Sequence, residues 1–195
     1  MQQKRRIRHI MSFILLTAGV ILFVILNICI GTVEISLSDI FASLQGKTVK
    51  NARILWDIRM PRTLAAMILG GGLALAGYLL QTFFHNPIAG PFVLGISSGA
   101  KMTVAVVMVF LTGKMIRISS GMLIFAAFLG AMISMGFVLL MSTKVHNMSM
   151  LVVSGVMIGY ICSAITELII TFASDAEIVN LHNWSLGSFS GTSWD

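Results

Sequence analysis

The sequence predicts an all-α membrane protein in which several apolar helices form a polytopic bundle. Its 195 residues are 57% hydrophobic and only 10% charged, and a soluble domain of this size cannot bury so large an apolar share. Five stretches are long and apolar enough to cross a bilayer, whose hydrocarbon core of roughly 30 Å needs about 20 helical residues. Several stretches also repeat small residues every four positions, a spacing typical of helices that pack closely in membranes.

The first predicted crossing covers residues 10–30, which carry no charged side chain and follow four basic residues of the N-terminal tail. A cleavable signal peptide is the alternative, but its apolar core would usually have about 7 to 15 residues and end in small side chains. Residues 25–30 remain mostly bulky, which favours a retained helix. The basic tail favours a cytoplasmic N-terminus, whereas basic residues in the later loops leave the orientation open.

Four further crossings follow along the chain. The third is interrupted near its start by Lys101, Gly95 and Gly99. We therefore expect it to begin inside a protein-lined cavity, where irregular backbone is tolerated. The ranges predicted for the second to fifth crossings are 63–84, 92–111, 122–141 and 150–172.

Small residues form a packing seam on each of three crossings. Helices in lipid associate where small side chains let their backbones approach, so plain helix packing is the favoured interpretation. The fifth crossing differs because Glu167 continues its seam, and an ionisable side chain there is expected to face a bundle interior, a water path or the outer interface. The seams are Ala66, Gly70 and Ala74; Ala126, Gly130 and Ser134; and Gly155, Gly159 and Ser163.

Several other functions lack support in the sequence. The net charge of +6 is spread over separate loops, so we expect no nucleic-acid partner. Residues 95–99 match the pattern of a serine nucleophile elbow, but neither a preceding strand nor an evident His and acid accompanies them. Residues 70–72 lack the Lys and hydroxyl residue of a phosphate-binding loop. The Cys and His residues are scattered, and we expect no catalytic residue, metal or cofactor.

Two segments resemble one family of membrane proteins. Residues 59–100, RMPRTLAAMILGGGLALAGYLLQTFFHNPIAGPFVLGISSGA, look like the signature of FecCD-type permeases, the bacterial ABC importers of iron-siderophores, haem and cobalamin. Residues 151–195 are similar to that family's fifth helix and the short helix after it. The two matches occur in the family's order and spacing.

The resemblance implies a permease subunit of ten helices in the bacterial cytoplasmic membrane, with its N-terminus in the cytoplasm. It would pair with an identical or different second permease subunit, be driven by two cytoplasmic ATPases and receive its ligand from an extracytoplasmic binding protein. Residues 1–195 would then form one transmembrane permease domain with five of the ten helices. We expect the ATPase-coupling loop to lie beyond Asp195.

The resemblance also implies a docking site for the binding protein at Arg59 and Arg62. These residues flank Pro61, which we expect to start a helix at the outer surface. Two permanently charged guanidinium groups suit carboxylates on a docking partner. The alternative is that both arginines only anchor the helix end among lipid headgroups.

The remaining implied sites are a cytoplasmic gate and a pathway wall. Pro87 ends the second crossing in a turn that matches one half of the family's gate, although a plain connecting turn is the alternative. Implied gate residues are Asn86 and Ile88 in this turn and Asn147, Met148 and Ser149 before the fifth crossing. Implied pathway-lining residues are Gly155, Gly159, Ser163 and Glu167.

Two other classes of function stay open. An ion-coupled secondary carrier would place polar sites at broken helices near the bilayer midplane, where only Glu167 or Lys101 are candidates in this chain. A membrane interaction protein without transport activity is the second. In either case, as for the importer, this chain performs no chemistry on a ligand.

Overall fold

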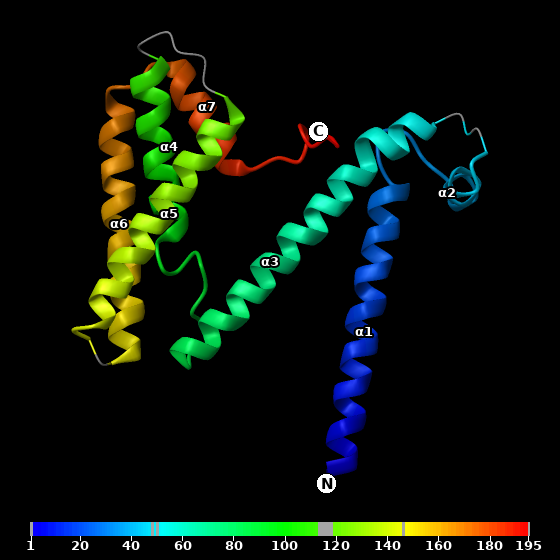
Figure 1. Cartoon of the computed structure of the whole chain (residues 1–195), viewed down its shortest axis with the longest axis horizontal. Helices are drawn as coiled ribbons and strands as arrows, with labels where there is room; N and C mark the ends of the chain where they lie inside the picture. Colours follow the sequence, from blue (N-terminus) through cyan, green and yellow to red (C-terminus); the bar gives the residue numbers. More distant parts are fainter. Residues whose placement is uncertain (1, 48, 50, 113–118, 146, 195) are drawn as a thin grey trace. The chain divides into compact units, whose positions relative to one another are not determined.

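The computed structural model describes residues 2–47, 49, 51–112, 119–145 and 147–194, and over this part the secondary structure is helical, which confirms the all-α class (Figure 1). The chain divides into two compact units, Met1–Gly70 with Phe189–Asp195, and Gly71–Ser188. The helices are α1 (Gln2–Cys29), α2 (Leu37–Leu44), the π-helix η1 (Ile54–Arg59), α3 (Met60–Phe84), α4 (Ile96–Thr112), α5 (Ser120–Ser142), α6 (Met148–Thr171) and α7 (Asp175–Leu186).

Among the described residues, four helical runs have the length and composition of membrane spans: α1, η1 with α3, α5 and α6. The helix of the third predicted crossing, α4, has 17 residues, which corresponds to about 25 Å. It begins at Ile96 rather than at Phe92, because residues 91–95 form turns and Gly95 has a φ of 72°, a conformation that favours glycine. A helix is therefore present at the predicted third crossing, but it is shorter than predicted and is not one of the four runs with the length of a membrane span.

Pro61 does not start a helix, contrary to the sequence prediction. It lies in the first turn of α3, inside a continuous helical run from Ile54 to Phe84. Proline has no N–H to donate to the preceding turn. That turn is π-helical, and the Met60 N–H bonds the carbonyl of Leu55, five residues earlier. A wider turn beside a proline is a recognised way to keep a helix continuous, with a local bend.

The first unit contains a small core at the carboxyl end of α1. Ile28, Ile35 and Leu55 are buried together there, which fixes the loop after α1 against η1. Within the apolar part of the two long helices, the Thr63 hydroxyl donates a hydrogen bond to the Asn27 Oδ1 at 2.8 Å. Hydrogen bonds between membrane helices contribute roughly 0.6 to 2 kcal/mol.

The second unit is organised around α4, which packs against α5, α6 and α7 (Figure 1). Val104 and Ala105 of α4 are fully buried, and Leu181 of α7 joins the same cluster. The short helix expected after the fifth crossing is thus present as α7, and it covers α4 rather than standing apart from the bundle.

Glycines allow the backbones of α4 and α5 to touch. A Cβ added at Gly130 would overlap the carbonyl oxygen of Gly99 and the hydroxyl of Thr103, and one added at Gly99 would overlap Ser134. The Thr103 hydroxyl donates to the Ala126 carbonyl at 2.7 Å. The predicted seam on the fourth crossing is therefore confirmed.

The seam predicted on the second crossing is not used in the same way. Gly70 and Ala74 are exposed in the structure, and Gly70 has no atom within 4 Å of an added Cβ. The pattern of small residues is the same as on α5, but the close contact made by Gly130 has no counterpart at Gly70.

We predict opposite effects for the same substitution at two glycines of α5. Gly130→Ala should lower the free energy of unfolding by about 1 to 3 kcal/mol, because its methyl group overlaps α4. Gly136→Ala should raise it by up to about 1 kcal/mol, because nothing lies near an added Cβ there and Ala is the better helix former. Unfolding of the purified chain in detergent, followed by circular dichroism, measures both. Equal effects would contradict the close contact.

Candidate functional site

Arg59 caps the carboxyl end of α1. Its side chain is only 8% exposed, and its guanidinium donates hydrogen bonds to the carbonyls of Ile28, Cys29 and Val33. The last carbonyls of a helix have no partner within the helix and carry the negative end of its dipole. A planar, always-charged guanidinium with five donors satisfies several of them at once.

Gly31 makes room for this cap. A Cβ at Gly31 would lie 2.7 Å from the Arg59 Nη2, so any larger residue would push against a guanidinium that three carbonyls hold in place. The end of α1 and the glycine in the loop after it, both far from Arg59 in the sequence, therefore accommodate the Arg59 side chain.

Arg62 lies one helical turn later and is half-buried. Its Nη2 donates to the Ser190 carbonyl at 2.6 Å, while its Nε is buried and has no hydrogen-bond partner among the residues that the structure describes. Both arginines line a cavity of about 560 Å³, together with Asn27, Thr32 and Phe189. The cavity wall thus carries two positive charges.

The two arginines differ in their freedom to bind a partner. The donors of Arg59 are directed at carbonyls of the same chain, whereas the Arg62 Nε has no hydrogen-bond partner in the described part of the chain. The sequence prediction treated the two arginines as equivalent, because two arginines around a proline do not reveal which backbone carbonyls lie opposite each guanidinium.

The first gate turn follows α3 directly. Asn86 is half-buried, and its Oδ1 accepts a hydrogen bond from the Ile88 N–H at 2.9 Å, which is a local turn that an Asn side chain commonly forms. His85 before it has a φ of 49°. Ile88 is 71% exposed, so its side chain stands out from the turn rather than packing into the unit.

The second gate turn contains the same kind of hydrogen bond, from a backbone N–H to the side chain of an Asn two residues earlier. Asn147 is the N-cap of α6, and its Oδ1 accepts a hydrogen bond from the Ser149 N–H at 2.9 Å. Asn147, Met148 and Ser149 are all exposed.

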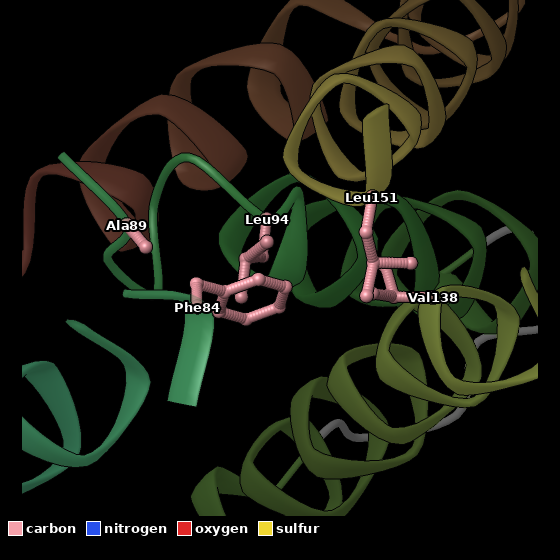
Figure 2. Close-up of a cluster of buried hydrophobic side chains, with 5 residues drawn as sticks. All are labelled: Phe84, Ala89, Leu94, Val138 and Leu151. Atoms are coloured by element: carbon pink, nitrogen blue, oxygen red, sulfur yellow. The ribbon is translucent and has the colours of Figure 1, made fainter. Parts of the chain in front are cut away.

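One cluster of buried side chains contains residues that lie next to both gate turns. Phe84, Ala89 and Leu94 come from the segment around the first turn, and Leu151 lies in the first helical turn after the second. Figure 2 shows these residues with Val138 of α5. Both turns are therefore attached to one packed end of the second unit.

The predicted pathway wall on α6 is only partly available. Gly155 and Gly159 are buried, because α4 and the turn before it lie against them: an added Cβ would be 2.9 Å from Leu94 at Gly155 and 3.1 Å from Gly95 at Gly159. The two glycines therefore take part in helix packing in the second unit, and pathway lining by them stays a prediction. The glycine spacing fits either role equally well.

Ser163 and Glu167, the other two predicted lining residues, are placed differently. Ser163 is half-buried, and its hydroxyl lies 3.5 Å from that of Ser98 on α4. Glu167 is exposed, away from the glycines. Pathway lining stays a prediction for these two. The exposed side of α6 also carries Tyr160.

The pattern at residues 95–99 is part of the helix packing. Residues before Gly95 form turns, and Ser97 lies in the first turn of α4. Gly95 itself contacts α6 so closely that an added Cβ would be 2.7 Å from the Gly159 nitrogen. Both glycines of the pattern are thus explained by close contacts with neighbouring helices.

Comparison with known proteins gives a consistent result. Residues 19–195 match the FecCD transport family. The chain is 32% identical to the vitamin B12 import system permease protein BtuC of Shigella boydii, over 99% of this chain and 56% of that protein. It is 33% identical to BtuC of Citrobacter koseri, over 99% of this chain and 55% of the relative.

A solved structure also matches this fold. It is an inward-facing ABC transporter assigned to the metal-chelate type, with a TM-score of 0.72 and 26% sequence identity. The match covers 92% of this chain and 54% of the other. The chain therefore spans about half the length of the proteins that it resembles.

The cap at the end of α1 yields a stability prediction. Arg59→Met keeps much of the side-chain length but removes every donor, so buried carbonyls lose charge-assisted bonds and the free energy of unfolding should fall by about 2 to 4 kcal/mol. Arg53→Met, at an exposed position just before η1, should change it by less than about 0.5 kcal/mol. Thermal unfolding in detergent compares the two. A loss for Arg59→Met no larger than for Arg53→Met would contradict the cap.

Proposed function

Since the chain belongs to the FecCD transport family, we propose that it is a permease subunit of an ABC importer that moves an iron-siderophore, haem or cobalamin-type ligand inward across the bacterial cytoplasmic membrane. The observation that carries this proposal is the family match over residues 19–195. The vitamin B12 import function named for the relatives supports the ligand class, and the apolar spanning helices support a multi-pass membrane protein.

The proposed subunit works with three kinds of partner. A second permease subunit, identical or different, completes the pathway, cytoplasmic ATPases supply the energy, and an extracytoplasmic binding protein delivers the ligand. The basic residues at the start of α1 support a cytoplasmic N-terminus. Residues 1–195 belong to one transmembrane domain in this proposal.

Docking of the binding protein is assigned to the arginine cavity. A carboxylate of the partner enters beside Arg62, which lines the cavity and whose permanent charge favours a charge-assisted hydrogen bond. Arg59 lines the same cavity. It contributes positive potential and holds the loop after α1 in position, while its own donors stay on the carbonyls of α1.

The cytoplasmic gate is assigned to the two asparagine turns. Asn86 and Ile88 form one half, and Asn147, Met148 and Ser149 form the other. The capped turns and the exposed Ile88 support this assignment, because a rigid turn presents an outward side chain in a defined position. Closure would require the corresponding turns of the partner permease.

The source of energy tests the proposed function. In proteoliposomes that contain the complete permease, its ATPase and its binding protein, uptake of radiolabelled cyanocobalamin or a ferric siderophore should require ATP. The ATPase variant without its catalytic glutamate should abolish uptake. Uptake that persists without ATP and disappears on Glu167→Gln would instead indicate an ion-coupled carrier.

Docking gives a separate prediction. In the same complete transporter, Arg62→Ala should weaken binding of the binding protein about tenfold and reduce its salt dependence, because one charge-assisted contact is lost. Arg53→Ala is the matched control, since Arg53 is exposed and does not line the cavity. Surface plasmon resonance at several salt concentrations measures both. Equal affinities for the two variants would contradict docking at Arg62.

A further inference from the structure

The short helix α2 presents an apolar side to its surroundings. Among its residues whose side chains the structure describes, Leu37, Ser38 and Phe41 are exposed, and at 100° per residue they share an arc of about 100°. Leu37 is 51% exposed and Phe41 is 63% exposed. These two residues lie one helical turn apart and are neighbours on the helix surface. Large apolar side chains therefore dominate the outward side of α2.

The opposite side of α2 is attached to the first unit. Residues 39, 40, 42 and 43 on that side are half-buried. Ile40 packs against the buried cluster that contains Ile28, in the last turn of α1. The Ser43 hydroxyl accepts a hydrogen bond from the indole N–H of Trp56 at 2.7 Å, which joins α2 to η1. These contacts determine which side of α2 faces away from the unit.

The position of Ile28 determines the depth of α2 in the bilayer. The apolar part of α1 begins at Ile10, directly after the basic tail, whose charges stay among headgroups or in water. Ile28 lies about 27 Å further along the helix, and the hydrocarbon core is roughly 30 Å thick. Ile28 and the α2 helix packed beside it therefore lie near the boundary between acyl chains and headgroups. Trp56, which contacts α2, is of a residue type enriched at this level.

The polar groups at the start of α2 are suited to this boundary. A capping box joins Ser36 and Asp39: the Asp39 N–H donates to the Ser36 hydroxyl at 3.2 Å, and the Ser36 N–H donates to the Asp39 Oδ2 at 3.3 Å. The hydroxyl of Ser38, on the outward side, lies 2.6 Å from that of Ser36. Since these groups have partners within the chain, contact with lipid leaves them satisfied.

Lipid fits the outward side of α2 better than a second protein does. Leu37 and Phe41 offer only a few hundred Å² of apolar surface, whereas a stable protein–protein interface needs about 800 Å² from each partner. Leu26 and Ile30, at the carboxyl end of α1, are exposed as well. Exposed apolar side chains thus occur on α1 and α2 at one level, where the lipid around a spanning helix is already present.

We propose that α2 is an interfacial helix, with Leu37 and Phe41 inserted among the phospholipid acyl chains of the leaflet at the carboxyl end of α1. An amphipathic helix of this kind buries its apolar side about 5 to 10 Å into the boundary between headgroups and acyl chains. The insertion holds the loop after α1, and with it the cap made by Arg59, at a fixed depth. This inference rests on the membrane-spanning helices and goes beyond the proposed importer function.

Spin-label accessibility tests the insertion in the complete transporter, reconstituted in phospholipid vesicles. Leu37→Cys, Phe41→Cys and Lys47→Cys are introduced separately after every native cysteine has been replaced by Ala, and each is labelled with a nitroxide. Lys47 is the matched control, because it is exposed in the loop directly after α2. Relative to a polar nickel chelate, oxygen should reach the labels at 37 and 41 at least about threefold more often than the label at 47, because hydrocarbon excludes the chelate.

Two results would overturn the insertion. If the nickel chelate reaches the label at Phe41→Cys as often as the label at Lys47→Cys, the outward side of α2 lies in water. If neither oxygen nor the chelate reaches the label at Phe41→Cys, a protein segment covers this side instead of lipid. Leu37→Cys gives the same distinction if labelled Phe41→Cys does not assemble into the transporter.

Hydrogen exchange in the same vesicles measures what the lipid contact contributes. Phe41→Ala should accelerate exchange of the α2 amides about tenfold, because burial of the Phe41 ring in lipid is lost. Few contacts within the chain are lost, since Phe41 is 63% exposed, and Ala is the better helix former. Phe41→Leu is the matched control and should accelerate exchange less than about threefold, because it keeps an apolar side chain. No acceleration in Phe41→Ala, or the same acceleration in both variants, would contradict the insertion.

Discussion

Close backbone contact around α4 is the constraint on which the second unit depends. Gly95 lies against Gly159 of α6, and Gly99 lies against Gly130 of α5. Helices in lipid gain little from hydrophobic burial against each other, so contact of this kind, with the hydrogen bonds that it permits, supplies the association. With α4 fixed by both neighbours, the gate turns and the exposed sides of α6 acquire defined positions.

The glycine side of α6 is used for contact with α4 and the turn before it. The two arginines of the first unit differ in the backbone groups that they bind. Arg59 donates to the carbonyls of Ile28 and Cys29 at the end of α1 and to that of Val33 in the loop after it, whereas Arg62 donates to the Ser190 carbonyl.

Hydropathy and small-residue spacing were sufficient to predict the helical class, a helix at the place of each predicted crossing and the α5 seam. They did not predict where α4 starts. Gly95 ends the preceding turn with a positive φ and lies against α6, and that contact cannot be read from the sequence of α4 alone. They also missed the π-helix before Pro61, since a proline fits either a helix start or a widened turn. Arg59 was predicted to offer its guanidinium to a docking partner, whereas its hydrogen-bond partners in the structure are backbone carbonyls more than 25 residues away, and backbone groups leave no signature in a sequence.

The most direct test of the account is a structure of the complete transporter in a lipid nanodisc at a resolution that distinguishes acyl chains from side chains. The account predicts that the backbone of Gly95 touches that of Gly159, and that of Gly99 touches Gly130, with neither lipid nor water between them. Lipid density between α4 and α6, or between α4 and α5, at these glycines would contradict it.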